Sequence, residues 1–195
     1  MTITNSCEIG KDHIADCLAK PVRGAKDRII IMARRAIKSY TEDTENHLII
    51  EDITRKDSTV DKAYEYVGLG KVLQPKTEFL QDDFGNKYLH EVEFLIHGTT
   101  PAVKLEMTKL AHERQGVIAI LEQNYRDGKS KWLLLGRKAG LYVKEMVDEE
   151  GRNIYRVLLG NKDDFEEPDP PSNVYDTDED TTDALIESLL ETTES

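Results

Sequence analysis

The sequence predicts a β-rich α+β protein: an antiparallel β-sandwich or barrel with one flanking helix and an acidic C-terminal tail. Three observations favour this class. Residues 88–97 alternate with a period of two, residues 100–116 carry one capped amphipathic helix, and short apolar runs separated by turn formers fill most of the rest. A chain of 195 residues is long enough for one domain of ordinary size plus a tail.

Residues 88–97 form the clearest predicted strand. Successive side chains of a strand point to opposite faces, so alternating residues share a face. One face carries Tyr88, His90, Val92, Phe94 and Ile96, and the other carries the two glutamates of the segment. This pattern is typical of a half-buried strand.

Further apolar runs predict the remaining strands, and residues 34–38 predict a single helical turn. Each run is short, is rich in β-branched or aromatic residues and is bounded by turn-forming residues. The predicted strands cover residues 28–32, 47–53, 62–70, 76–80, 117–121, 131–135, 141–147 and 153–159.

One helix is predicted between Thr100 and Gly116. Thr100 is a suitable N-cap, Pro101 suits the first turn, and Gly116 suits the end of a helix. Spacings of three and four residues give the segment one apolar stripe, made by Val103, Met107, Leu110 and Ala111.

Charge divides the chain into a near-neutral body and an acidic tail. Residues 163–195 hold 13 of the 38 acidic residues and no lysine or arginine, which leaves 25 acids against 26 bases in residues 1–162. Residues 163–182 contain Pro168, Pro170 and Pro171 and have the composition of a solvated linker. The expected organisation is a structural domain over 1–162, a linker over 163–182 and a short terminal element over 183–195.

The terminal element is amphipathic. Leu185 and Leu189 form one pair at i,i+4, and Ile186 and Leu190 form another. Residues 183–191 are too few for a stable isolated helix, so the segment must dock on its own body or on a neighbour. Our hypothesis is that these four residues dock on an adjacent copy or on the next component of an assembly.

The stretch 132-WLLLGRKAGLYV-143 raises the question of a phosphate-binding loop between Gly136 and Gly140. Such a loop needs a helix after it, whose N–H groups converge on the anion. Leu141, Tyr142 and Val143 favour a strand instead. We therefore expect a turn between two strands rather than a cradle.

No catalytic constellation is visible, and we predict a protein that is not an enzyme and has no cofactor. The five histidines are scattered, and no nucleophile stands beside an obvious base. Cys7, His13 and Cys17 lack the paired spacing of a zinc site. Two cysteines are too few to staple a chain of this size, so we expect both to be reduced.

One metal pattern occurs in the tail. With Asp176 as position one of a calcium loop, Asp178, Asp180 and Glu187 fall at positions three, five and twelve. Thr181 stands where such a loop needs glycine, and no entering helix precedes the segment. The alternative function that this pattern leaves open is a small soluble binding module whose acidic tail binds calcium or a basic protein.

Three stretches together resemble virion structural proteins of tailed bacteriophages, of the tail-tube and neck-ring type. They are 16-DCLAKPVRGAKDRIIIMARRAI-37, the turn–strand–helix–strand order of residues 79–124, and 132-WLLLGRKAGLYV-143 followed by 155-YRVLLG-160. The resemblance implies a β-sandwich or barrel with a flanking helix that assembles into a homo-oligomeric ring. It also implies that Gly136 and Gly140 let a strand bend or a second subunit approach closely.

Further expectations follow from this resemblance. The chain would act in the virion, after assembly in the host cytoplasm, beside adjacent virion proteins. DNA would pass only as non-specific cargo, repelled by a net charge of −12. No apolar run is long enough to span a bilayer, so we expect no membrane partner.

Overall fold

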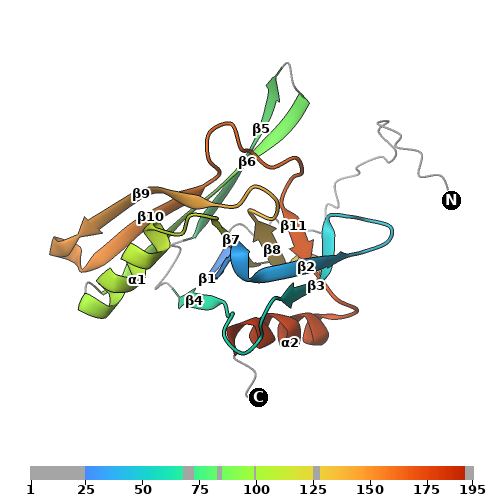
Figure 1. Cartoon of the computed structure of the whole chain (residues 1–195), viewed down its shortest axis with the longest axis horizontal. Coiled ribbons are helices and arrows are strands. Elements are labelled where there is room, and N and C mark those ends of the chain that lie inside the picture. The colour runs from blue at the N-terminus through green and yellow to red at the C-terminus, as the bar shows by residue number, and fades with distance from the viewer. Residues whose placement is uncertain (1–24, 68–72, 83–84, 99, 125–127, 192–195) are drawn as a thin grey trace.

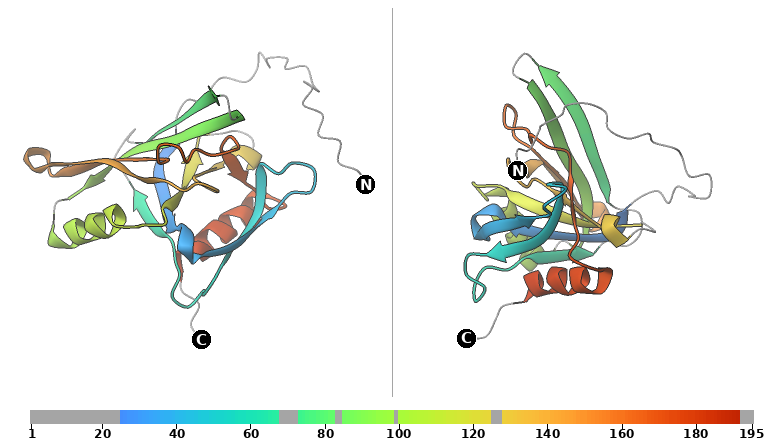
Figure 2. Two further views of the ribbon diagram at one scale, coloured as in Figure 1. Left: turned by 45° about the horizontal axis from the view of Figure 1, so that its top comes forward. Right: turned by 90° about the vertical axis from the view of Figure 1, so that its right-hand side faces the viewer.

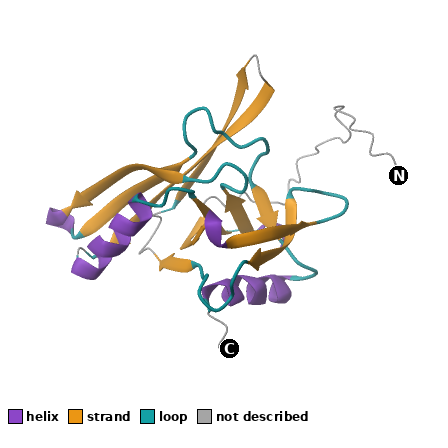
Figure 3. Ribbon diagram, in the orientation of Figure 1, coloured by secondary structure: helices purple, strands orange, loops and turns teal. Residues whose placement is uncertain are grey.

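The computed structural model describes residues 25–67, 73–82, 85–98, 100–124 and 128–191, which fold into two β-sheets and two α-helices. The two sheets pack as a sandwich, and within the described residues they do not close into a barrel (Figure 1). Strands predominate, as Figure 3 shows. The predicted β-rich α+β class is therefore confirmed, in its sandwich form.

The first sheet has seven strands in the order β2-β3-β11-β8-β7-β1-β4. All neighbours are antiparallel except β3 and β11, which run parallel. The strands are β1 (Ala25–Ala33), β2 (Ile37–Glu42), β3 (Ile49–Arg55), β4 (Tyr64–Val67), β7 (Val117–Gln123), β8 (Trp132–Leu135) and β11 (Ser172–Val174).

The second sheet has four antiparallel strands in the order β5-β6-β10-β9. Its two hairpins extend beyond the sandwich in different directions (Figures 1 and 2). The strands are β5 (Gln74–Asp82), β6 (Gly85–His97), β9 (Tyr142–Glu149) and β10 (Ile154–Gly160).

The predicted alternation along β6 is confirmed. His90, Val92 and Phe94 are buried, while the side chains between them are only partly covered. The buried face packs on the first sheet and forms one core cluster with alternate residues of β1 and β7, including Ile29 and Leu121.

A second cluster covers the opposite face of the first sheet. It contains Ile30, Ile118 and Trp132 from the sheet and Ile186 and Leu189 from the C-terminal helix. Because the central strands are covered on both faces, β7 is apolar along nearly its whole length.

Helix α1 (Pro101–Ala111) begins as the sequence predicts. The Thr100 side chain accepts a hydrogen bond from the N–H of Val103. The helix ends at Ala111, before Gly116, which has a φ of 75° in the turn into β7. Three short 3₁₀ turns complete the elements: η1 (Arg34–Ala36), η2 (Gly128–Ser130) and η3 (Glu150–Arg152).

The structure corrects the expected division at residue 162. Residues 163–182 are not a solvated linker, because β11 lies within the first sheet between β3 and β8. The terminal helix α2 (Glu179–Leu190) begins four residues earlier than predicted and is capped by Asp178, whose side chain accepts from the N–H of Thr181. The acidic C-terminal segment is thus an integral part of one folded domain.

Candidate functional site

The loop Gly136–Gly140 joins β8 to β9, so a strand follows it and not a helix. Its backbone nonetheless forms an anion cradle, and a carboxylate of the same chain fills it. Glu167, which is 2% exposed, accepts hydrogen bonds from the N–H groups of Lys138, Ala139 and Gly140 at 2.7–3.3 Å. Because Glu167 fills the cradle, this loop is a structural contact between the β8–β9 turn and the C-terminal segment.

Gly136 and Gly140 both have positive φ, 75° and 83°. A Cβ added at Gly136 would lie 2.7 Å from Cγ of Leu141, and one at Gly140 would lie 2.8 Å from Cδ of Arg34. The chain approaches itself closely at both positions. Both glycines therefore allow a tight turn and close packing within their own chain.

Arg137 points inward from the same loop and is 6% exposed. Its guanidinium donates to the Glu42 carboxylate, to the His47 carbonyl and to the Asp169 carboxylate at 3.0–3.2 Å. Burial alone would raise the pKa of Asp169, but a hydrogen bond from Lys138 and the nearby charges of His47 and Arg137 outweigh it and lower the pKa. This network ties β2, the loop and the C-terminal segment together.

His90 lies beneath the loop with 2% of its surface exposed. Its Nδ1 accepts from the N–H of Gly136 at 3.3 Å, so a neutral ring carries its proton on Nε2. Nε2 has no hydrogen bond of regular geometry with the described residues. Burial lowers the pKa of His90 to about 4, although the neighbouring Asp169 acts in the opposite direction.

Asn161 completes this buried polar centre. Its side chain accepts from the N–H of His90 at 2.6 Å and donates to the carbonyl of Gly140 at 2.9 Å. The Tyr40 hydroxyl is also buried without a hydrogen-bond partner among the described residues, and burial raises the pKa of this phenol. The centre fixes the second sheet against the loop and offers no nucleophile beside a base.

The four residues predicted to dock the tail lie on the chain's own first sheet. Ile186 is 0% and Leu189 is 1% exposed, and Leu185 and Leu190 pack against the same cluster while partly exposed. The hypothesis of docking on a neighbour is corrected in this respect, because the outer face of the sheet supplies an apolar surface within the same chain.

Polar contacts hold α2 in this place. Trp132 donates from Nε1 to the Asp183 carboxylate at 2.8 Å, and the Lys131 ammonium donates to the same side chain. At the middle of the helix, Arg28 pairs with Glu187 at 2.6 Å. Each of these contacts joins residues more than 50 positions apart in the sequence.

The predicted calcium pattern does not gather in space. Asp178 caps α2, Glu187 pairs with Arg28, and Asp176 bonds the neighbouring Thr177 hydroxyl. Within the described part of the chain, no group of three or more acidic, histidine or cysteine side chains could hold a metal ion. The other metal candidates, Cys7, His13 and Cys17, lie outside the described residues.

The exposed surface carries a feature that the sequence did not reveal. The first sheet ends at β2 and β4, and the second at β5 and β9. Large apolar side chains are exposed at two of these edges: Tyr64 and Val67 on β4, at 53% and 64%, and Phe79 on β5, at 51%. Phe79 packs against Tyr88 across the β5–β6 hairpin, with ring centroids 5.4 Å apart.

A groove runs between the β4 edge and α1. Its volume is about 310 Å³, and six of its seven described lining residues are apolar or aromatic, namely Tyr66, Ile96, Ala102, Val103, Leu105 and Met107; the seventh is Glu106. No helix in the described residues is long and apolar enough to cross a membrane. Comparison of the chain with protein-family models, with curated proteins and with solved structures gave no match.

Proposed function

We propose that this chain is a structural subunit of a tailed-bacteriophage virion that assembles with copies of itself into a ring of the tail tube or neck. One observation carries the assembly: the edge strand β4 combines a row of backbone groups with exposed Tyr64 and Val67, and its Tyr66 lines the apolar groove beside α1. Uncovered strand edges pair readily with other chains, and exposed apolar patches mark interaction surfaces.

The β5–β6 hairpin supplies the reach that such an assembly needs. This hairpin extends past the sandwich (Figure 2). It carries the Phe79–Tyr88 pair. A head-to-tail contact between identical chains forms a ring when its rotation closes. The virion setting rests on the sequence resemblance, which spans the loop at Gly136 and the strands around it.

Within the described residues, the side chains do not favour the competing functions. Two of the four acidic groups of the calcium pattern are already engaged, because Asp178 caps α2 and Glu187 pairs with Arg28. The best-formed polar centre, around His90 and Glu167, is buried and bound to the backbone of its own chain.

The assembly can be tested by changing the β4 edge. Val67→Asp replaces an exposed apolar side chain of the edge strand β4 by a charge and should abolish or strongly weaken self-association, measured by sedimentation velocity over a wide range of protein concentration. Val60→Asp is the matched control, because Val60 is equally exposed at 69% but lies outside the strands.

Electron microscopy of the wild-type assembly then tests the ring. Closed rings of uniform diameter support the proposal. A wild-type chain that stays monomeric at every concentration, or a Val67→Asp variant that assembles as well as Val60→Asp, would contradict the role given to this edge.

A further inference from the structure

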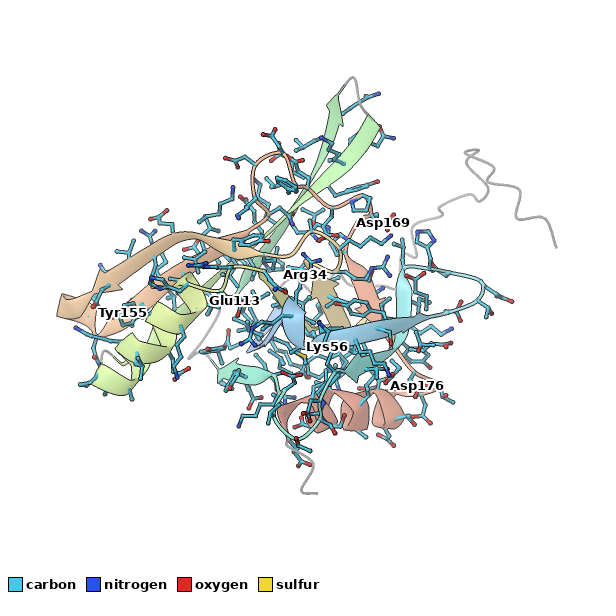
Figure 4. The ribbon with its side chains drawn as sticks, viewed as in Figure 1. Arg34, Lys56, Glu113, Tyr155, Asp169 and Asp176 are labelled. Carbon is cyan, nitrogen blue, oxygen red and sulfur yellow. The ribbon has the colours of Figure 1, made fainter. Side chains whose placement is uncertain are left out.

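A cleft with a cationic lining opens beside η1. Of the described residues, three cations, one amide and one phenol line its volume of about 370 Å³: Arg34, Arg35, Lys56, Gln115 and Tyr142. Figure 4 shows Arg34 and Lys56 close together near η1, with Glu113 to one side. In a chain with a net charge of −12, such a concentration of positive charge requires an explanation.

Little of this charge is neutralised within the described part of the chain. The Arg34 guanidinium donates to a neutral acceptor, the Ala139 carbonyl, at 2.9 Å. Lys56 makes no side-chain hydrogen bond or ion pair with the described residues. Arg35 alone pairs with a carboxylate, that of Glu113 at 3.1 Å.

An adjoining hollow extends the positive surface. It shares Tyr142 with the cleft and adds two cations, Arg114 and Lys162, against one acidic lining residue, Glu113. The Lys162 ammonium lies 4.5 Å from the centre of the Tyr142 ring. The ring therefore sits between two cationic regions, a setting that suits a partner rich in carboxylates.

An acidic surface lies at the opposite end of β7. The cleft adjoins the start of β7, where the N–H of Arg34 donates to the Gly116 carbonyl. Lys131 adjoins its other end, where the N–H of Gln123 donates to the Lys131 carbonyl. Seven residues of strand separate the two ends by roughly 20 Å, at about 3.3 Å per residue.

At that far end begins α2. The segment Asp176–Asp183 contains five acidic residues, of which Glu179 and Asp183 pair with Lys131. Asp176 and Asp180 have no cationic partner among the described residues. Figure 4 shows Asp176 beside the N-terminal end of α2, apart from Lys56.

We propose that the cationic cleft of one subunit receives the acidic N-terminal end of α2 from a second copy of the chain, in a head-to-tail contact. The inference rests on the proposed assembly and identifies one of its interfaces. Positive and negative surfaces separated by the length of β7 suit a head-to-tail contact, and that contact either closes into a ring or continues as a stack. A nucleic-acid partner is less suited, because a strongly negative chain repels phosphates at long range.

Charge reversal and its compensation test this contact in the full-length chain. Lys56→Glu and Asp180→Lys should each weaken self-association about tenfold, the effect of losing one close charge pair across an interface. The double variant carrying both changes restores an opposite-charge pair and should return to within about twofold of wild type. Arg152→Glu is the control, since its side chain is 78% exposed at the tip of the β9–β10 hairpin, away from the cleft.

Sedimentation velocity at low and high salt measures these constants, and gel shift with labelled duplex DNA runs beside it. Weakening by both single variants with recovery in the double variant supports the contact. Assembly that occurs but is unchanged by either reversal overturns this inference and leaves the proposed function standing, whereas a wild-type chain that never assembles removes both. DNA binding that Lys56→Glu abolishes, with self-association unchanged, would instead assign the cleft to phosphates.

Discussion

The buried carboxylate of Glu167 accepts a hydrogen bond of 2.7 Å from the backbone N–H of Ala139. The same carboxylate also receives the N–H groups on either side, from Lys138 and Gly140. Residues that the sequence places in an acidic linker thus supply the anion for a loop 28 positions earlier in the chain. The C-terminal segment is needed to satisfy the polar backbone of the central loop.

Replacing Glu167 by glutamine should therefore destabilise the fold. Both carboxylate oxygens accept from the N–H of Lys138, so an NH₂ group in place of one of them would face this donor, and the negative charge within the cradle would be lost. We expect a loss of about 2 kcal/mol in the free energy of unfolding, measured by urea denaturation. Glu145→Gln is the control, because Glu145 is 57% exposed and makes one ion pair, with Arg156 at 3.4 Å. An equal loss of stability in both variants would contradict this role of Glu167.

Gly136→Ala should cost more than an ordinary glycine replacement. An L-residue at a φ of 75° is strained by roughly 1 kcal/mol, and the new Cβ would lie 2.7 Å from the Leu141 side chain. We expect a combined loss of about 2 kcal/mol or more, measured as a shift in the denaturation midpoint. Gly151→Ala is the control and should be near neutral, since nothing lies within 4 Å of its added Cβ. Equal denaturation midpoints for the two variants would contradict the strain expected at Gly136.

The buried side of α2 gives a third prediction. Leu189→Ala removes a side chain that is 1% exposed and leaves a cavity beneath the helix. The expected loss is about 2–5 kcal/mol in the free energy of unfolding. Leu105→Ala makes the same change on α1 at a residue that is 56% exposed, and should cost well under 1 kcal/mol in the monomer. A neutral Leu189→Ala variant would mean that α2 does not dock as the structure shows.

Much of the fold could be predicted because its signals are local. The alternation along β6 and the Thr100 cap of α1 depend on neighbouring residues, and both have the expected form. The apolar run of β7 likewise marks a strand covered on both faces. Period and capping are decided within a few residues, so a single sequence contains them.

The C-terminal segment could not be predicted in the same way. Strand β11 has only three residues, Ser172–Val174, and follows a proline-rich acidic stretch. It is a strand because β3 and β8 provide backbone partners on both sides, at Ile49 and Trp132. Tertiary pairing of this kind overrides composition and leaves no periodic signal in so short a run.

The loop at Gly136 shows a similar limit. The sequence indicates a turn between strands, and the structure has one, but the carboxylate that fills its backbone cradle comes from Glu167. Nothing in the spacing distinguishes Glu167 from Glu166, because only the fold brings Glu167 to the N–H groups of the loop. A hydrogen-bond partner distant in the sequence can be found only once the sheets are assembled.

Burial of His90 predicts a pH-dependent stability. Its pKa is about 4 in the folded chain and near 6.5 when exposed, so the unfolded state binds a proton first as the pH falls. The contribution of the neutral ring is fully present above pH 6.5 and is lost progressively between about pH 6.5 and pH 4. The total loss is on the order of 3 kcal/mol, with carboxylate titration adding to it at the acidic end.

The variant His90→Gln isolates this contribution. Glutamine does not titrate, so the difference in unfolding free energy between wild type and variant should shrink as the pH falls from 7 toward 4, when both are measured by urea denaturation at each pH. Leu105→Ala is the control, because it changes an exposed side chain and no titratable group, and it should give a difference that hardly changes with pH. If the His90→Gln difference is as flat as that of the control, His90 is not held neutral by its burial, and the polar centre beneath the loop must be open to water.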